Sequence, residues 1–137
     1  MRVFVDLDVL LDALQQRAPH YDSSYQSLEI LTNSVNDLFV SLHSVATLYY
    51  FLNKHAGKEK AEEGISWLMT HFQIARCTKQ EIWNSIDRGY PDFEDGIVAE
   101  EARLESCEVI LTRNVKDYKL SPVPALSPEE FLAKSKE

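Results

Sequence analysis

The stretch Val3-Phe4-Val5-Asp6-Leu7-Asp8 decides how the rest of the chain is arranged. Arg2 to Asp6 alternates little between apolar and polar residues and is rich in Val and Phe, which is typical of a strand covered on both faces. Asp6 ends this strand. From Asp8 the apolar residues fall at helical spacing, and Asp8 is placed to cap the first turn. A strand that leads directly into a helix predicts the first part of a βαβ unit.

Strand-like and helix-like segments alternate along the whole chain. The expected strands after the first are residues 37–41, 72–75, 108–112 and 122–126. The expected helices are residues 8–16, 21–33, 44–54, 58–71, 79–87, 92–105 and a last one that Ser127 caps. Such alternation implies right-handed βαβ units. We therefore expect an α/β fold, a three-layer α/β/α sandwich with a mainly parallel, Rossmann-like sheet of about five strands.

Two of these helices carry specific predictions about burial. In the helix at 79–87, Ile82, Trp83 and Ile86 have the spacing of a core-facing stripe. In the helix at 92–105 the charged side chains are expected to be largely solvated. They are Glu94, Glu100, Glu101 and Arg103.

Length and composition favour one globular domain over residues 1–137, with 45% hydrophobic and 26% charged residues. The apolar runs are too short to span a bilayer, and no signal-peptide pattern is visible, so we expect a cytoplasmic protein without a membrane segment. Cys77 and Cys107 fit neither a metal-ligand spacing nor a disulfide framework. The formal net charge of −8 disfavours binding of nucleic acid by a broad basic face. Bound metal could still invert the charge locally.

Acidic and amide side chains occur where a parallel sheet would gather them at one edge. Asp6 closes the first strand, Asn114 and Asp117 follow the fourth, and Asp92 and Asp95 are three apart at a helix start. Open α/β sheets bind ligands at the carboxyl ends of their strands. Carboxylates that lack a cationic partner repel one another, so such a cluster usually holds a hard cation, here Mg²⁺ or Mn²⁺. Hydrolysis of a phosphodiester is the chemistry that follows.

Each of these residues also has a simpler structural explanation. Asp8 is as good a helix cap as a ligand, and Asp92 can cap a helix whose third position is Asp95. Thr112 and Asn114 can simply shape a turn. A lone histidine such as His43 is more often packed or exposed than a ligand. Asp6 is the hardest to dismiss, because an acid that closes an apolar strand usually has a partner.

Four motifs together resemble one known family, the PIN-domain ribonucleases, and especially the bacterial VapC-like toxins of type II toxin-antitoxin pairs. Val5-Asp6-Leu7-Asp8-Val9-Leu10-Leu11-Asp12 resembles the opening "DTNVLLD" of that family, and Pro91-Asp92-Phe93-Glu94-Asp95-Gly96 resembles "PDFEDAL". Thr112-Arg113-Asn114-Val115-Lys116-Asp117-Tyr118 is similar to "TRNxKDF", and Pro124-Ala125-Leu126-Ser127-Pro128-Glu129-Glu130-Phe131 to "PVLTPEEFL". The similarity extends over nearly the whole chain.

This resemblance implies a PIN-like fold, dependence on Mg²⁺ or Mn²⁺, and an endoribonuclease that cleaves single-stranded or looped RNA. It also implies a homodimer and a cognate antitoxin whose peptide blocks the acidic groove. Asp6 and Asp95 would be the primary metal ligands, with Asp92 and Asp117 completing the acidic cluster. The remaining candidates by the same resemblance are Thr112 and Asn114, which orient ligand or water.

The sequence departs from the family pattern at four positions. Thr47 stands where many members carry a Glu on the helix after the second strand, so one acid of the family set is replaced. Asp8 replaces the usual Asn, and is a further candidate metal ligand, while Leu7 replaces the usual Thr. Gly96 stands where Ala is common, which loosens its helix by up to about 1 kcal/mol.

Three other functions compete with the nuclease. The first is a PIN-like binding module that is catalytically weak or inactive, which the Thr47 replacement supports and the retained acids oppose. The second is a haloacid dehalogenase-type phosphatase, since Asp6-Leu7-Asp8 follows a strand, but the Thr, Lys and Gly-Asp elements of that family are missing. The third is a phosphoacceptor receiver domain, which needs an Asp on the third strand that residues 72–75 do not supply.

Overall fold

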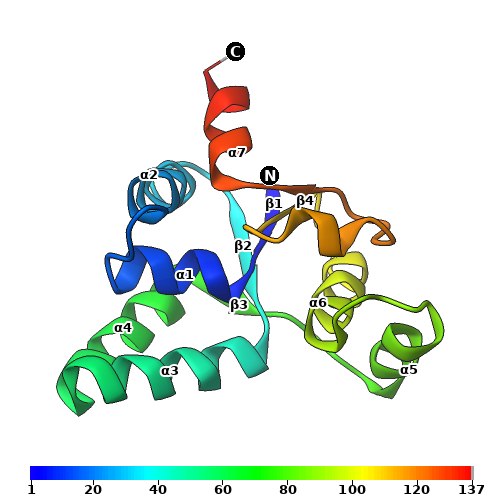
Figure 1. Ribbon diagram of the computed structural model, residues 1–137, viewed down its shortest axis with the longest axis horizontal. Helices are drawn as coiled ribbons and strands as arrows, with labels where there is room; N and C mark the ends of the chain where they lie inside the picture. The colour runs from blue at the N-terminus through cyan, green and yellow to red at the C-terminus, as the bar shows by residue number, and fades with distance from the viewer. Residues whose placement is uncertain (137) are drawn as a thin grey trace.

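Parallel strands form the centre of the computed structural model, which describes residues 1–136 (Figure 1). Within that range they make one five-stranded sheet in the order β3-β2-β1-β4-β5, and every pairing is parallel. The strands are β1 (Arg2–Val5), β2 (Asp37–Val40), β3 (Phe72–Ile74), β4 (Val109–Leu111) and β5 (Ala125–Leu126). The predicted α/β class with a parallel sheet of about five strands is confirmed.

Helices follow the strands in the predicted order. They are α1 (Leu7–Leu14), α2 (Tyr21–Thr32), α3 (Leu42–Ala56), α4 (Lys58–His71), α5 (Lys79–Asp87), α6 (Phe93–Leu104) and α7 (Pro128–Ser135), with the 3-10 helix η1 (Val115–Tyr118) after β4. The fifth strand is shorter than predicted, because Pro122 and Pro124 have no N–H to donate to a sheet. No helix within residues 1–136 is long and apolar enough to cross a membrane.

Side chains of β1 alternate between two apolar clusters on opposite faces of the sheet. Val3 and Val5 pack with residues of α1, α2, α3, α4 and α7. Phe4 points to the other face, where it packs with Val98 and Ala102 of α6. Figure 1 shows the same division, with α1 to α4 on the left of the sheet and α5 and α6 on the right. Both faces of β1 are therefore covered, as its unbroken apolar sequence predicts.

The first helix begins one residue earlier than predicted, and its cap is different. Asp6, not Asp8, occupies the N-cap of α1 and accepts a hydrogen bond from the Leu7 amide at 2.8 Å. The prediction of Asp8 as the cap is therefore wrong. Asp6 has the extended backbone that an N-cap requires (φ −77°, ψ 156°), whereas Asp8 already lies inside the first turn. The predicted cap of α7 by Ser127 is confirmed, and it forms a capping box with Glu130.

The burial predicted for α5 is wrong, and in α6 it is wrong for Glu100 and Glu101, whereas Glu94 is exposed as predicted. Ile82, Trp83 and Ile86 are 40%, 59% and 54% exposed, whereas Glu100 and Glu101 are almost fully buried. The reason is that α5 packs on α6 instead of on the sheet, and the contact between the two helices is polar. The carboxylate of Glu100 accepts hydrogen bonds from Tyr90 Oη at 2.9 Å, Asn84 Nδ2 at 3.1 Å and Arg103 Nε at 3.3 Å. It also forms an ion pair with Arg88 Nε at 3.6 Å.

Gly96, in the first turns of α6, lies directly against the ring of Tyr90. A Cβ added at Gly96 would lie 3.0 Å from Cδ2 and 3.2 Å from Cβ of Tyr90. Tyr90 cannot move away easily, because it is buried and its hydroxyl is bound to Glu100. The glycine therefore allows a close approach between the start of α6 and the segment before it.

We expect Gly96→Ala to lower the free energy of unfolding, by about 1 kcal/mol, although Ala is the better helix former. The clash with Tyr90 would outweigh the gain in helix propensity. Chemical denaturation of the two proteins measures the difference. Glu94→Ala, at an exposed position in the same turn of α6, is the control for the helix propensity of Ala. A Gly96→Ala protein more stable than the parent would contradict this account of the packing.

Candidate active site

Asp6 lies at the carboxyl end of β1 and has the most highly connected carboxylate of this edge. It is only 7% exposed. Its Oδ1 accepts the Leu7 amide, and its Oδ2 accepts hydrogen bonds from the hydroxyls of Thr112 and Tyr118, each at 2.9 Å. Burial raises the pKa of Asp6, and these hydrogen bonds to the charged form offset part of the rise. Thr112 comes from the end of β4 and Tyr118 from η1, so three elements converge on one carboxylate.

Tyr118 connects Asp6 to Asp95 of α6. Its hydroxyl also lies 3.2 Å from Oδ1 of Asp95, so a single hydroxyl proton lies between two carboxylates. Burial, followed by the charges of Asp6 and Asp92, raises the pKa of Asp95 to about 8. Burial and the charges of Asp6 and Asp95 raise the pKa of Tyr118 as well, so that its phenol keeps its proton. The carboxylates of Asp6 and Asp95 therefore have too little positive charge around them.

Asp8 lies beside Asp6 and increases this shortage. Its Oδ2 accepts a hydrogen bond from the Arg113 amide at 3.1 Å. Its Oδ1 is buried and has no hydrogen-bond partner among residues 1–136. Burial and the charge of Asp6 raise the pKa of Asp8 to about 7. A buried carboxylate oxygen without a donor is costly, and a cation would satisfy it.

Asp92 and Asp117 lie at the margin of this group. The Oδ1 of Asp92 caps α6 by accepting the Asp95 amide at 2.9 Å, as the structural alternative predicts. The charges of Asp92 and Asp117 both help to raise the pKa of Asp95, so both acids lie close to it. Asn114 is exposed, and its carbonyl accepts the Asp117 amide at 2.9 Å. Its own amide donates to the Thr112 hydroxyl at 3.1 Å, so its backbone shapes the turn between β4 and η1.

Two polar side chains that the sequence analysis did not assign to the site also belong to this edge. Ser41 ends β2, and its hydroxyl lies 2.6 Å from Nδ1 of His43. The charge of His43 lowers the pKa of Asp6, which means that the imidazole lies close to that carboxylate. The signal was present in the sequence: Ser41-Leu42-His43 follows an apolar strand in the same way as Asp6-Leu7-Asp8. Tyr118 was missed as well, because the pattern alone gives a tyrosine no role.

Arg113 and Thr47 lie near this acidic edge, and their side chains bind groups other than the carboxylates of Asp6 and Asp95. The guanidinium of Arg113 is paired with the buried carboxylate of Asp12, which draws this cation away from Asp6. Thr47, one turn after His43 in α3, donates its hydroxyl to the His43 carbonyl at 2.9 Å. That position therefore contributes a helix contact and no carboxylate.

The oxygen atoms of this edge fit a hard cation such as Mg²⁺. Within residues 1–136 no three acidic, His or Cys side chains converge closely enough to enclose an ion by themselves. Mg²⁺ does not need such a cage, because it keeps several water ligands and usually binds through one or two carboxylates. Asp6 Oδ2 already accepts two donors, whereas Oδ1 accepts one. The oxygens with spare lone pairs are therefore Oδ1 of Asp6, Oδ2 of Asp95 and Oδ1 of Asp8.

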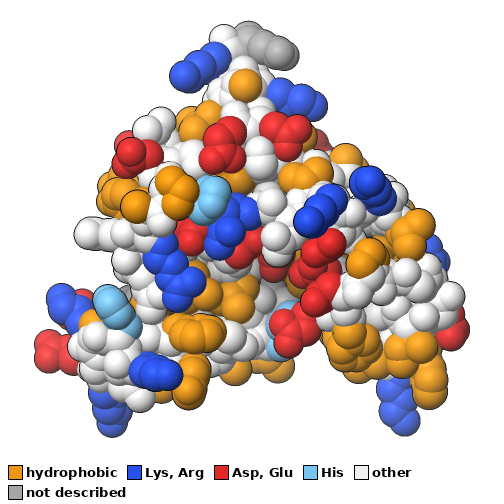
Figure 2. Space-filling model, in the orientation of Figure 1, with side chains coloured by type: hydrophobic (Ala, Val, Ile, Leu, Met, Phe, Trp, Pro, Cys, Tyr) orange, Lys and Arg blue, Asp and Glu red, His pale blue; other side chains and the backbone are white. Residues whose placement is uncertain are grey.

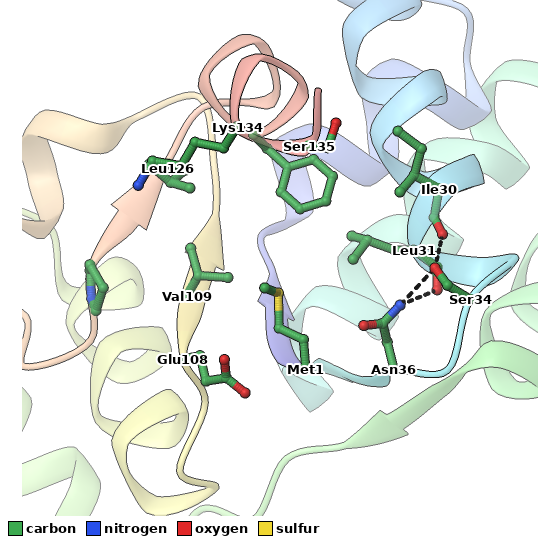
Figure 3. Close-up of a pocket in the computed structure, with 12 residues that line it drawn as sticks. Met1, Ile30, Leu31, Ser34, Asn36, Glu108, Val109, Leu126, Lys134 and Ser135 are labelled. Carbon is green, nitrogen blue, oxygen red and sulfur yellow. Dashed lines mark hydrogen bonds between the residues drawn. The ribbon is translucent and has the colours of Figure 1, made fainter. Parts of the chain in front are cut away.

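A cavity of about 420 Å³ lies at the opposite end of the strands (Figure 3). Apolar side chains of Leu31, Val109 and Phe131 line it, and Asn36 closes one side with hydrogen bonds to the Leu31 carbonyl and the Ser34 hydroxyl. It contains none of the predicted site residues. The acidic edge and this cavity are therefore separate features of the molecule.

The fold and the acidic edge define a three-layer α/β protein with a polar site at the carboxyl ends of β1 and β4. The chain belongs to the PIN domain family, whose model, described as "PIN domain", matches residues 2–116. It is 31% identical over 135 residues to Ribonuclease VapC1 of Aquifex aeolicus, covering 95% of this chain and 92% of that protein. The predicted family is confirmed, and the phosphatase and receiver alternatives are set aside.

Solved structures share the fold at lower sequence identity. VapBC2 from Rickettsia felis, bound to a promoter DNA fragment, has a TM-score of 0.71 at 20% identity and covers 93% of this chain and 98% of its own. VapBC-1 from nontypeable Haemophilus influenzae has a TM-score of 0.71 at 16% identity, covering 94% and 99%. VapC20 of Mycobacterium tuberculosis, described as a sarcin-ricin loop cleaving toxin, has a TM-score of 0.63 at 13% identity, covering 79% and 86%.

Replacing Asp95 by Asn should stabilise the metal-free protein at pH 8. Because the pKa of Asp95 is raised in the folded state to about 8, folding favours its protonated form. The resulting stability is present in acid and is lost as the pH rises from the usual carboxyl range through pH 8. Asp95→Asn should remove this loss and gain about 1 kcal/mol at pH 8, since water screens much of the repulsion at a half-exposed carboxylate.

Thermal unfolding in chelator at pH 6 and pH 8 measures this effect as a difference between the two proteins. Glu94→Gln is the control, since it removes the same charge from an exposed neighbour in the same helical turn. If both variants respond equally to pH, the repulsion assigned to Asp95 is absent.

Proposed function

We propose that the protein is a metal-dependent endoribonuclease that hydrolyses RNA phosphodiesters, the VapC-like toxin of a toxin-antitoxin pair. The observation that carries the proposal is the pair of carboxylates, Asp6 and Asp95, that share the Tyr118 hydroxyl at the edge of a PIN domain. The identity to Ribonuclease VapC1 supports it over nearly the whole chain. A pair of acids whose charges oppose folding is expected where a cation belongs.

The cation would be Mg²⁺ or Mn²⁺, held by Asp6 and Asp95 with Asp8 beside them. Asp92 and Asp117 would add negative charge and bind through water. When bound, such an ion lowers the pKa of a water molecule and stabilises the charge that develops on the phosphate group.

The side chains around the pair have definite tasks in this proposal. Thr112 and Tyr118 hold the carboxylate of Asp6 in one orientation through its Oδ2. Thr112 also binds the backbone of Asn114, whose exposed side chain would orient the ligand or a water molecule. His43 adds an imidazole next to Asp6, on the helix where Thr47 supplies no acid.

The proposed partners are an RNA substrate and a cognate antitoxin protein. Two of the structural neighbours, from Rickettsia felis and Haemophilus influenzae, are VapBC assemblies. A second copy of the chain is a further proposed partner. The exposed apolar side chains of Ile82, Trp83 and Ile86 on α5 would suit a contact with another protein surface.

Metal binding and RNA cleavage should be lost together in the double variant Asp6→Asn plus Asp95→Asn. Calorimetry with Mn²⁺ measures binding, and a mixed pool of single-stranded RNA measures cleavage, which should fall at least about 100-fold because the charge that stabilises the transition state is gone. Glu94→Gln, which removes an exposed acid from the first turn of α6, should behave as the parent. A folded parent protein that neither binds Mn²⁺ nor cuts RNA would favour the inactive binding module instead.

The two roles of Asp92 can be separated by substitution. Asp92→Ser keeps a side-chain cap on α6 but removes the charge, whereas Asp92→Ala removes both. We expect Asp92→Ser to keep its thermal stability and lose affinity for Mn²⁺ several-fold, and Asp92→Ala to lose about 1 kcal/mol of stability in addition. If Asp92→Ser binds Mn²⁺ as tightly as the parent protein, Asp92 is a cap only.

A further inference from the structure

Phe93 is a large apolar side chain in an acidic neighbourhood. It is the first residue of α6, between the cap Asp92 and the proposed ligand Asp95, and it is 51% exposed. It is not among the side chains that pack on either apolar cluster within residues 1–136. Its ring therefore contributes little to the core of the protein.

The start of α6 does not require an aromatic residue at this position. The carboxylate of Asp92 already caps the helix by accepting the Asp95 amide. A hydrophobic staple would join the residue before the cap to the fourth helical position, which here are Pro91 and Gly96. Phe93 belongs to neither pair. Neither capping nor core packing explains why a phenylalanine is exposed here.

Positive charge is available on the neighbouring element. Lys116 and Lys119 are exposed on either side of Asp117 and Tyr118, and Tyr118 joins η1 to α6 through its hydrogen bond to Asp95. Figure 2 shows Lys and Arg side chains beside the group of acidic side chains on this face of the molecule. An exposed aromatic ring with cations nearby is the combination by which proteins bind single-stranded nucleic acid.

From this arrangement we propose that Phe93 is the platform on which an unpaired base stacks, next to the phosphate that is cleaved. The inference rests on the proposed ribonuclease function and adds a requirement on the substrate. Phe93 stands two residues before Asp95 at the start of α6, and Tyr118 joins Asp95 to Asp6. A phosphate bound at the acidic pair would therefore lie at the end of the helix that carries Phe93, where the adjoining base can reach the ring. A base in a duplex is already stacked and cannot use the ring. The contact would therefore explain, through one side chain, the single-stranded or looped RNA that the family resemblance implies.

Stacking also predicts how selective this contact is. Every base has an aromatic face, so the ring tolerates any base and responds mainly to whether one is present. Sequence preference must then come from other side chains.

The test uses a short single-stranded RNA with one mapped cleavage site, in which each nucleotide around the site is replaced in turn by an abasic one. The parent protein, Phe93→Ala and Phe93→Trp are compared by kcat/KM. Tyr25→Ala is the control, since Tyr25 is a similarly exposed aromatic residue on α2, across the sheet. Fluorescence anisotropy with an uncleavable 2′-O-methyl RNA, with and without the abasic nucleotide, measures binding independently of cleavage.

One abasic position should slow the parent protein by about 10- to 100-fold, the range expected for losing one base–aromatic stack. Phe93→Ala should lose a similar factor on intact RNA and nothing further at that abasic position, while Phe93→Trp and Tyr25→Ala should behave as the parent. Anisotropy should show the same pattern. Equal abasic effects in the parent and Phe93→Ala would overturn the inference.

Failure of the proposed function gives a different result. If the parent protein cuts no RNA, the ribonuclease proposal fails on its own, and the anisotropy comparison still decides whether Phe93 stacks on a base. If Phe93→Ala cleaves RNA normally but escapes inhibition by a co-expressed antitoxin, the ring is a protein contact and the stacking proposal is wrong.

Discussion

Electrostatic repulsion among buried carboxylates is the constraint that governs this edge of the molecule. Asp6 is held in place by donors from α1, β4 and η1, and its position fixes those three elements relative to one another. The same residue shares a hydroxyl with Asp95, so α6 joins the arrangement from the far face of the sheet. An arrangement this acidic is tolerable because the hydroxyls of Thr112 and Tyr118 bring donors without bringing positive charge. The protein keeps the carboxylates together with little positive charge beside them: His43 lowers the pKa of Asp6 and Arg113 that of Asp8, but burial outweighs both.

The sheet could be predicted because its signals are local. Apolar runs, helical spacing and a Ser-Pro-x-Glu start each depend on a few neighbouring residues, and each appears in the structure. The covered faces of β1 follow from its unbroken apolar sequence, whereas the strand order was found only in the structure. The acids at the ends of β1 and β4 were predicted as candidates because parallel strands place their carboxyl ends at one edge.

The burial predictions were wrong where α5 packs on α6 instead of on the sheet. Spacing predicts which side chains of α5 share a face, but it does not reveal that the face turned toward α6 is the polar one. Glu100 is buried because Tyr90, Asn84 and two arginines surround it, and those partners come from several segments. Tyr118 and His43 were missed for a related reason. Their importance lies in what they touch, and a contact such as that between Tyr118 and Asp6 spans 112 residues of sequence.

Oδ1 of Asp6 has two roles. It accepts the Leu7 amide and so caps α1, and it keeps a spare lone pair for a ligand. Any ligand that draws electron density from Oδ1 weakens its hold on the Leu7 amide, and any strain at the start of α1 alters the reach of that oxygen. Ligand binding at Asp6 is therefore thermodynamically linked to the stability of α1, which covers the face of the sheet opposite α6. Occupancy of the acidic edge would therefore change how readily the first turn of α1 frays.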